Sequence, residues 1–271
     1  MNMTHFSKIF ALTIALLLYT GCLYAETQSE ETTNDDVSTS ETLFNQGLNY
    51  YNGNDIPVNK QKAVECWQKA AKLGHAGAQF RLSCCYANGD GVDKDLTEAV
   101  KWTRKAAEQG NAEAQYILGV CYENGRGVKK DMAEAVKWYS KAAEQGEAKA
   151  QYNLGNCYYD GEGVEKDLEE AVKWYRKAAE QGNADAQCDL AICYYHGIGV
   201  PYDKSEAVKL WRKAAEQGLP MAQFTLGIRY YSGDGISKDK SEAIKWFRKA
   251  AEQGDEDAIE VLKDLGEWNE D

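Results

Sequence analysis

The chain has 271 residues, of which 44% are hydrophobic and 27% are charged, a composition that permits a large buried core. Its formal net charge of −12 and its pI of about 4.9 oppose binding to the phosphate backbone of a nucleic acid and to an anionic lipid surface. The charge therefore argues against nucleic acid and favours a basic or neutral protein or peptide as the partner.

Residues 1–25 have the pattern of a signal peptide. Lys8 precedes an apolar run of 11 residues, Ile9 to Tyr19, which is too short to span a bilayer but suits the core of an export signal. We therefore predict that the protein is exported from a bacterial cytoplasm, as a periplasmic protein, a membrane-anchored lipoprotein or a secreted protein.

Two cleavage sites fit this signal. The letters from Tyr19 to Cys22 resemble a lipobox, whose cleavage would remove residues 1–21 and attach a lipid to Cys22, although Tyr19 stands where leucine is usual. The letters from Leu23 to Ala25 suit an ordinary signal peptidase, which cuts after a small residue. We favour the lipoprotein, in which the N-terminal lipid would be the only contact with a membrane.

Residues 26–40 are polar and acidic, with almost no apolar side chains. Such a segment cannot bury enough apolar surface to offset the entropy of folding. We predict a disordered tether that ends at Ser40 and leads into the repeated part of the chain, from Glu41 to Gly254.

A pattern of 36 residues returns along this part of the chain. The stretch from Asn111 to Gly146 is one copy, and a shift of 36 residues in either direction reproduces it almost letter for letter. A fixed period of this length is typical of a solenoid, in which each repeat packs only on its neighbours. The glycine that ends each repeat falls in one register: Gly74, Gly110, Gly146, Gly182, Gly218 and Gly254.

Each repeat is predicted to form two helices. In residues 112–124 the apolar side chains follow helical spacing around Leu118. The second helix begins after Asp131, and Glu134 three residues later suggests a capping box, in which the aspartate accepts backbone N–H groups and the glutamate bonds back to the aspartate. Gly146 supplies a left-handed cap at the end of the second helix.

A G-x-G turn joins the two helices, as at Gly125 to Val128. A glycine loop before a helix can bind phosphate, and residues 88–95 contain some oxygen ligands of a calcium loop. The turn recurs five times, without a preceding strand, a P-loop lysine or the distal glutamate of an EF-hand. We therefore interpret it as a reused helix–helix turn, and we predict neither a cofactor nor a metal site.

Residues 255–271 follow the last repeat. The segment from Asp257 to Gly266 predicts one more helix, which is rich in acidic side chains, and Trp268 follows in an acidic tail. A polar helix at this place would cap the last apolar face of the solenoid.

The letters from Leu118 to Gly146, beginning L-G-x-x-Y-x-x-G-x-G-V-x-x-D, resemble the Sel-one-like (SLR) repeat family, relatives of the tetratricopeptide repeats. The resemblance covers about six repeats and implies a right-handed, all-α solenoid that acts as an adaptor for protein partners. In cysteine-rich members of the family a disulfide ties the two helices of a repeat. The positions that align with those cysteines, such as Ala107 and Gln115, hold no cysteine here.

The cysteines are interpreted as small buried side chains. Stacked helices lie about 8–10 Å apart, whereas a disulfide needs alpha carbons within about 7 Å, so cysteines in one register should not pair. Cys66 with Cys84 or Cys85 is the one local pair that could form a bridge. Four of the eight cysteines share a register beside the core leucine: Cys85, Cys121, Cys157 and Cys193.

No catalytic residue is predicted. The three histidines have no metal-ligand set or base partner in register, and no S-x-x-K nucleophile motif is present. The alternative to a non-enzymatic adaptor is an enzyme of the cysteine-containing SLR type, which would bind or hydrolyse β-lactams or act through a thiol.

A second stripe on the first helix carries the functional prediction. With Leu118 in the core, Tyr116 and Glu123 lie roughly opposite, and the equivalent positions of other repeats are mostly aromatic. By resemblance to tetratricopeptide solenoids, this stripe would line the concave surface and hold a peptide or a partner helix; alternatively, the Tyr116 position packs on the next repeat. The predicted partner-binding residues are Tyr51, Tyr116, Tyr152, Tyr159, Tyr195, Phe224 and Tyr231, with Asn88 and Asn124 beside them.

Overall fold

The computed structural model describes residues 34–54 and 56–268, and within them the chain forms thirteen helices and no strand. The predicted signal peptide, the lipidation site Cys22 and residues 26–33 of the predicted tether lie outside the described residues. No described helix combines the length and the apolar character that crossing a membrane requires. The predicted all-α fold of stacked helix-turn-helix repeats is confirmed.

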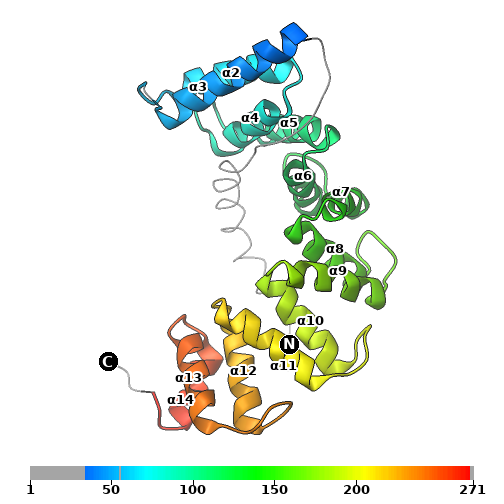
Figure 1. Cartoon of the computed structure of the whole chain (residues 1–271), viewed down its shortest axis with the longest axis vertical. Helices are drawn as coiled ribbons and strands as arrows, with labels where there is room; N and C mark the ends of the chain where they lie inside the picture. The colour runs from blue at the N-terminus through cyan, green and yellow to red at the C-terminus, as the bar shows by residue number, and fades with distance from the viewer. Residues whose placement is uncertain (1–33, 55, 269–271) are drawn as a thin grey trace. The chain divides into compact units, whose positions relative to one another are not determined.

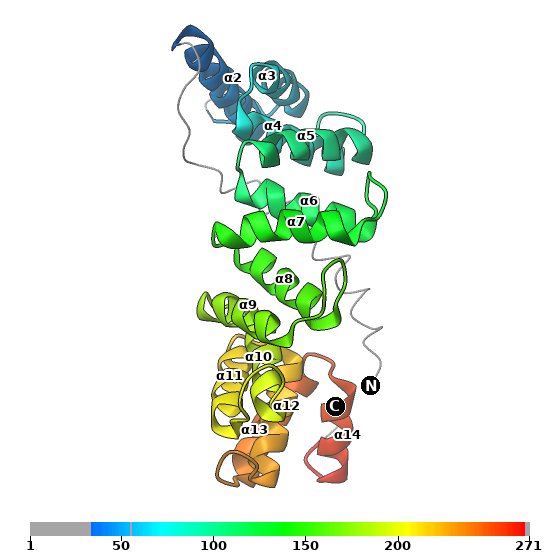
Figure 2. The ribbon, with the colours of Figure 1, turned by 90° about the vertical axis from the view of Figure 1, so that its right-hand side faces the viewer.

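Two helices form each repeat, and one further helix follows the sixth repeat (Figure 1). Figures 1 and 2 show the helices of each pair side by side. The pairs are α2 (Asn34–Asn52) with α3 (Lys60–Lys72), α4 (Ala76–Asn88) with α5 (Leu96–Glu108), α6 (Ala112–Asn124) with α7 (Met132–Glu144), α8 (Ala148–Asp160) with α9 (Leu168–Glu180), α10 (Ala184–His196) with α11 (Lys204–Glu216) and α12 (Pro220–Ser232) with α13 (Lys240–Ala251), before α14 (Glu256–Asp264).

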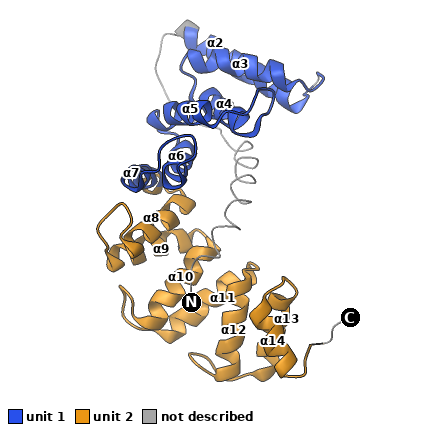
Figure 3. Cartoon of the chain, turned by 180° about the vertical axis from the view of Figure 1, so that it is seen from behind, with its two compact units in different colours: residues 1–142 blue, residues 143–271 orange. Residues whose placement is uncertain are grey.

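The chain divides into two compact units after Ala142 (Figure 3). In the first unit α3 packs on both α2 and α4, and α5 packs on both α4 and α6. In the second unit each helix from α9 to α13 packs on the helix before it and the helix after it. Contacts between neighbours in sequence therefore build the core of each unit, as expected for a repeat protein.

The first helix begins earlier than the sequence predicts. Residues 34–40, which we predicted to be disordered, form the first turns of α2. Ser40 is only 6% exposed, and its hydroxyl donates a hydrogen bond to the Val37 carbonyl at 3.1 Å. The polar composition misled the prediction, because adding turns to a helix that Phe44 already anchors in the core needs no new apolar surface.

The predicted capping box is half right. In the fourth repeat the carboxylate of Asp167 accepts a hydrogen bond from the Glu170 backbone N–H at 2.9 Å. The backbone N–H of Asp167 donates to the Tyr158 carbonyl at 2.9 Å, so it leaves no donor for the glutamate. The Glu170 carboxylate instead pairs with Lys173 at 2.8 Å, one turn further along α9. The glutamate half of the prediction is therefore wrong.

The second glycine of the G-x-G turn allows the turn to pack closely against the preceding repeat. Gly127 and Gly199 have φ values of 68° and 62°, which favour glycine. A side-chain carbon added to Gly127 would lie 2.2 Å from the Leu96 carbonyl oxygen, and one added to Gly199 would lie 2.1 Å from that of Leu168. The turn thus packs against the start of the preceding repeat's second helix, which supports its interpretation as a helix–helix turn.

A buried glutamine links neighbouring repeats. Gln187 on α10 is 4% exposed; its amide nitrogen donates to the Ala179 carbonyl at the end of α9 at 3.1 Å, and its oxygen accepts from Gln217 at 2.8 Å. One amide therefore joins three helices. The equivalent carbonyls of other repeats accept hydrogen bonds from Gln79, Gln115, Gln151 and Gln223. Equivalent glutamine pairs join Gln79 to Gln109, Gln151 to Gln181 and Gln223 to Gln253.

A hydrogen bond stands where the cysteine-rich relatives are expected to have a disulfide. Gln115 donates to the carbonyl of Ala107 at 3.0 Å, and these two positions align with the bridging cysteines of that subgroup. The one disulfide that the sequence allowed, between Cys66 and Cys84 or Cys85, does not form, and Cys66 remains a thiol. Three of the four cysteines in one register are buried, as predicted, and Cys121 is half-buried.

The close approach of the two helices within a repeat predicts a sharp response to substitution. A side-chain carbon on Gly155 would lie 2.6 Å from the ring of Tyr175. We expect Gly155→Val to lower the free energy of unfolding by about 1–3 kcal/mol, measured by urea denaturation, because the ring cannot move without disturbing the core.

The matched control is Ser83→Val, at the equivalent position of the second repeat, which faces Thr103 instead of a ring and lines a cavity. We expect this variant to unfold at nearly the wild-type urea concentration. Equal losses in the two variants would contradict the packing described here.

Candidate functional site

Most of the predicted aromatic stripe of the second unit reaches the surface. Tyr152, Tyr159 and Tyr195 are half-buried, and Tyr231 is 41% exposed. Phe224 is half-buried and lies with its ring 5.7 Å from that of Phe247. These five residues therefore combine packing with accessible aromatic surface.

Two of the predicted residues of the first unit, Tyr116 and Asn124, behave differently. Tyr116 is 6% exposed and packs with its ring 6.0 Å from that of Tyr139, so the structure assigns it to the core and not to a binding surface. Asn88 and Asn124 are exposed, but the Asn124 amide nitrogen donates to the Val120 carbonyl of its own helix at 2.9 Å. Neither the ring of Tyr116 nor this amide group is presented to a partner.

Two of the stripe tyrosines are tied to the turn of the next repeat. The Tyr195 hydroxyl donates to the carboxylate of Asp234, which also pairs with Lys204 at 2.6 Å and with Arg229 at 3.0 Å. Hydrogen bonds from Lys204 and from Tyr195 lower the pKa of Asp234, as does the charge of Arg229. In the first repeat the hydroxyl of Tyr51 donates to the Asp90 carboxylate at 3.1 Å.

Tyr159 does not make the equivalent hydrogen bond to the next turn, because Ile198 occupies the place of the aspartate. Its ring lies 6.4 Å from that of Tyr175, and the ring of Tyr152 lies 5.9 Å from that of Tyr175. The Tyr175 hydroxyl donates to the Asn156 side chain at 2.7 Å, which fixes the central ring. Tyr152 and Tyr159 thus form an aromatic surface on α8 that packs on the ring of Tyr175.

Carboxylates lie beside these rings. Asp189 on α10 accepts a hydrogen bond from the Tyr152 hydroxyl at 2.9 Å, and it lies close enough to Asp185 and Asp160 to feel their charges. Within residues 34–54 and 56–268, none of these three carboxylates forms an ion pair with a basic side chain. We call Tyr152, Tyr159, Asp160, Asp185 and Asp189 the tyrosine–aspartate face.

The electrostatics of this face favour an incoming cation. The pKa of the Asp189 carboxyl is raised to about 6, chiefly by burial and also by the charges of Asp185 and Asp160, while the Tyr152 hydrogen bond acts to lower it. Burial also raises the pKa of Asp185 and of Asp160, and the charge of Lys166 lowers that of Asp160. A positive charge that approaches relieves the repulsion among the three carboxylates, and the Tyr152 ring attracts it as well, whereas the ammonium of Lys166 already lies 5.5 Å from the centre of the Tyr159 ring.

Sequence reasoning missed Asp189, although a signal was present in the repeat register. Asp189 is the acidic residue at a repeat position where the other repeats have none, and its carboxylate accepts a hydrogen bond from a tyrosine 37 residues earlier. The equivalent residues of the other repeats are Asn45, Arg81, Ile117, Asn153 and Thr225.

Thiol chemistry is disfavoured near this face. Burial, together with the charge of Asp189, raises the pKa of Cys188 and that of Cys193 to about 12. The thiolate is the nucleophilic form of cysteine, so these two side chains are poor nucleophiles at neutral pH. The arrangement is therefore suited to binding a charged group rather than to covalent catalysis.

Paired helices, a tight glycine turn and a bonded link between successive repeats define an α-solenoid repeat protein. The Sel1 repeat model matches residues 40–75, 76–111, 112–147, 148–183, 184–219 and 220–255, and the chain belongs to the Sel1 repeat family. Repeats of this family generally serve as protein-interaction scaffolds.

Two solved structures are similar over most of the chain. A protective antigen of uropathogenic Escherichia coli with an SLR fold is 37% identical, with a TM-score of 0.80 over 94% of this chain. The match covers 55% of the antigen, so the chain spans about half of its length. A Sel1 repeat protein from Oxalobacter formigenes is 35% identical, with a TM-score of 0.69 over 88% of this chain and 95% of its own. No curated protein matches the sequence significantly.

The raised pKa of Asp189 predicts how stability depends on pH. Because the folded state holds this proton more tightly than the unfolded chain, stability should fall as the pH rises from about 4 to about 6, by on the order of 2–3 kcal/mol at most. Asp189→Asn copies the residue of the preceding repeat, Asn153, and should remove this part of the pH dependence and raise stability at pH 7.

The measurement is urea denaturation of wild type and variant across this pH range. Asp264→Asn, on the exposed part of α14, is the control and should keep the wild-type dependence. If Asp189→Asn has the same pH dependence as wild type, the environment assigned to Asp189 is wrong.

Proposed function

We propose that this protein is an exported, non-enzymatic scaffold that binds a basic segment of a protein or peptide partner at the tyrosine–aspartate face. The observation that carries the proposal is the meeting of two half-buried tyrosine rings with three carboxylates, of which only Asp160 feels the charge of a nearby lysine, Lys166. The function of Sel1 repeats as interaction scaffolds supports it.

A lysine or arginine side chain of the partner fits this face. Its charge would pair with Asp189 and its neighbours, and a hydrogen bond to a charged group contributes about 1.5–3 kcal/mol. Its methylene groups would lie on the half-buried rings of Tyr152 and Tyr159 and would displace Lys166 from the Tyr159 ring. The net charge of −12 would speed the approach of a basic partner and make its binding weaken with salt.

Crosslinking in the native cell followed by mass spectrometry tests the proposal. We expect a partner that is captured by the wild type and lost with Tyr159→Ala or with Asp189→Asn, with affinity reduced about tenfold or more for each, equal to about 1.4 kcal/mol. Purified partner should bind at low salt and dissociate as the salt concentration rises.

Tyr202→Ala is the matched control, because Tyr202 is 58% exposed and lies outside the face. It should capture the partner as the wild type does. If Tyr202→Ala and Tyr159→Ala lose the partner equally, or if neither does, the face is not the binding site. Turnover of a reporter β-lactam that thiol blocking abolishes would favour the enzymatic alternative instead.

Export with a lipid anchor is the part of the proposal that rests on residues 1–25 alone. Cells fed an alkyne-labelled fatty acid should yield labelled protein from wild type and unlabelled protein from Cys22→Ser. Unlabelled wild type that is nonetheless shortened at Ala25 would support ordinary signal cleavage in place of lipidation.

A further inference from the structure

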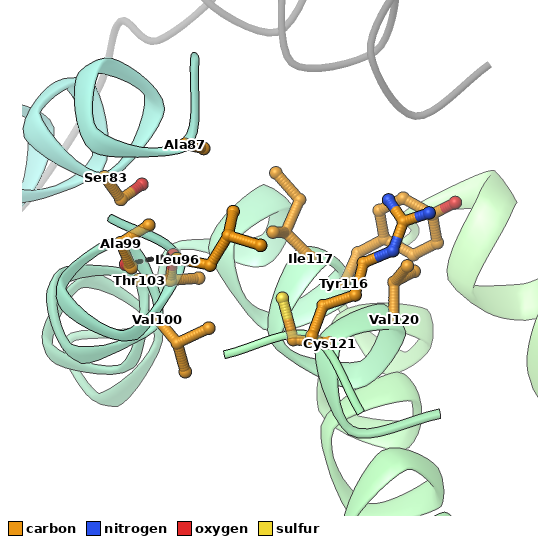
Figure 4. Close-up of a pocket in the computed structure, with 11 residues that line it drawn as sticks. Ser83, Ala87, Leu96, Ala99, Val100, Thr103, Tyr116, Ile117, Val120 and Cys121 are labelled. Atoms are coloured by element: carbon orange, nitrogen blue, oxygen red, sulfur yellow. Dashed lines mark hydrogen bonds between the residues drawn. The ribbon is translucent and has the colours of Figure 1, made fainter. Parts of the chain in front are cut away.

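A pocket lies between α4, α5 and α6 in the first unit (Figure 4). Its cavity volume is about 70 Å³, whereas a cavity volume of about 10–15 Å³ is enough to hold one water molecule. It therefore admits a side chain of several heavy atoms, such as leucine, isoleucine or methionine. Its walls include Ala87, Val100, Thr103, Ile117 and Cys121.

The pocket exists because the second repeat lacks two rings that other repeats carry. Ala87 stands where the first, fourth, fifth and sixth repeats have a tyrosine, and Thr103 stands where every other repeat has an aromatic residue. In the first repeat the corresponding rings, Tyr51 and Trp67, lie 5.4 Å apart and fill the space. The second repeat therefore keeps the helix framework and leaves the space open.

The pocket is apolar although a threonine lines it. The Thr103 hydroxyl donates to the Ala99 carbonyl of its own helix at 2.9 Å and presents its methyl group to the cavity (Figure 4). Leu96 at the pocket is 41% exposed, and Ile117 is half-buried. Water in such a hollow has few polar groups to bond, so an apolar side chain that displaces it gains free energy.

A cation lies at the same pocket. Arg126 is half-buried, lines the cavity and forms no ion pair with any residue that the structure describes. It begins a turn that also contains Lys129 and Lys130, whereas the same turn holds Asp90 and Asp93 in the second repeat. In a protein with net charge −12, this turn is a local basic site beside an apolar hollow.

We propose that this pocket binds an acidic segment of a partner protein, with an aliphatic side chain in the cavity and the carboxylate of a neighbouring aspartate or glutamate on Arg126. The basic turn, with three cationic side chains, complements more than one acidic residue of such a segment. The site is separate from the tyrosine–aspartate face and prefers the opposite charge, so one scaffold would engage basic and acidic segments at different repeats.

NMR titration with three peptides, each acetylated and amidated at its ends, tests the proposal. The peptide with Leu-Glu-Glu should shift the methyl signals of Leu96, Ile117 and Val120 at concentrations up to about 5 mM, which detects dissociation constants near 1 mM. The peptide with Leu-Gln-Gln should bind about tenfold more weakly, and the peptide with Ser-Glu-Glu should leave these methyl signals unchanged. No shift with Leu-Glu-Glu would overturn the proposal.

Two variants separate the cavity from the charge. The triple variant Ser83→Gly, Ala87→Tyr and Thr103→Tyr gives the second repeat the residues of the fourth, in which a glycine makes room for the Tyr175 ring, so it should fill the cavity, keep the fold and abolish the shifts. Arg126→Gln should leave the cavity open and weaken Leu-Glu-Glu about tenfold without affecting Leu-Gln-Gln. Binding that survives the filled cavity, or is indifferent to Arg126→Gln, would overturn the proposal.

The controls separate this site from the proposed function. Asp189→Asn alters only the tyrosine–aspartate face and should bind Leu-Glu-Glu as the wild type does. Melting temperatures of all variants show that each is folded. Loss of peptide binding in Asp189→Asn would mean that the peptide occupies the other site, and it would overturn the assignment to the pocket.

Discussion

The buried glutamine amide is the interaction on which the stacking of the repeats depends. Gln187 gives the Ala179 carbonyl at the end of α9 a second donor beside the Gly182 backbone N–H and, with its oxygen, holds the residue that ends α11. Each of the two hydrogen bonds contributes about 0.5–1.5 kcal/mol, and the loss of one such amide affects three helices together. Because the bond fixes where each helix ends relative to the next, it also fixes where the tyrosines and aspartates of adjacent repeats meet.

Local signals predicted the helices well. The apolar spacing in residues 112–124 and the aspartate before the second helix are properties of a few neighbouring residues, and α6 has the predicted bounds. What the sequence could not show depends on contacts between repeats. The Asp167 backbone N–H, for example, finds its acceptor on Tyr158 across the turn, which leaves Glu170 to pair with lysine.

The candidate sites lie where a repeat departs from the common pattern. Asp189 among neutral and basic equivalents, and Ala87 and Thr103 among aromatic ones, can be noticed in an aligned sequence. Their consequences cannot be read there, since a missing ring can be compensated by movement of its neighbours. Tyr116 illustrates the reverse case, because a residue that fits the binding stripe by spacing is used for packing instead.

The glutamine links have a further consequence for how such proteins grow. Every bond in the link joins positions a fixed number of residues apart, such as the 30 residues between Gln187 and Gln217. Duplication or deletion of one whole repeat therefore leaves each donor with an acceptor, whereas a change of any other length would break the series. Sel1 proteins can then change length in steps of 36 residues without redesign of their interior, and each new copy is free to acquire its own surface.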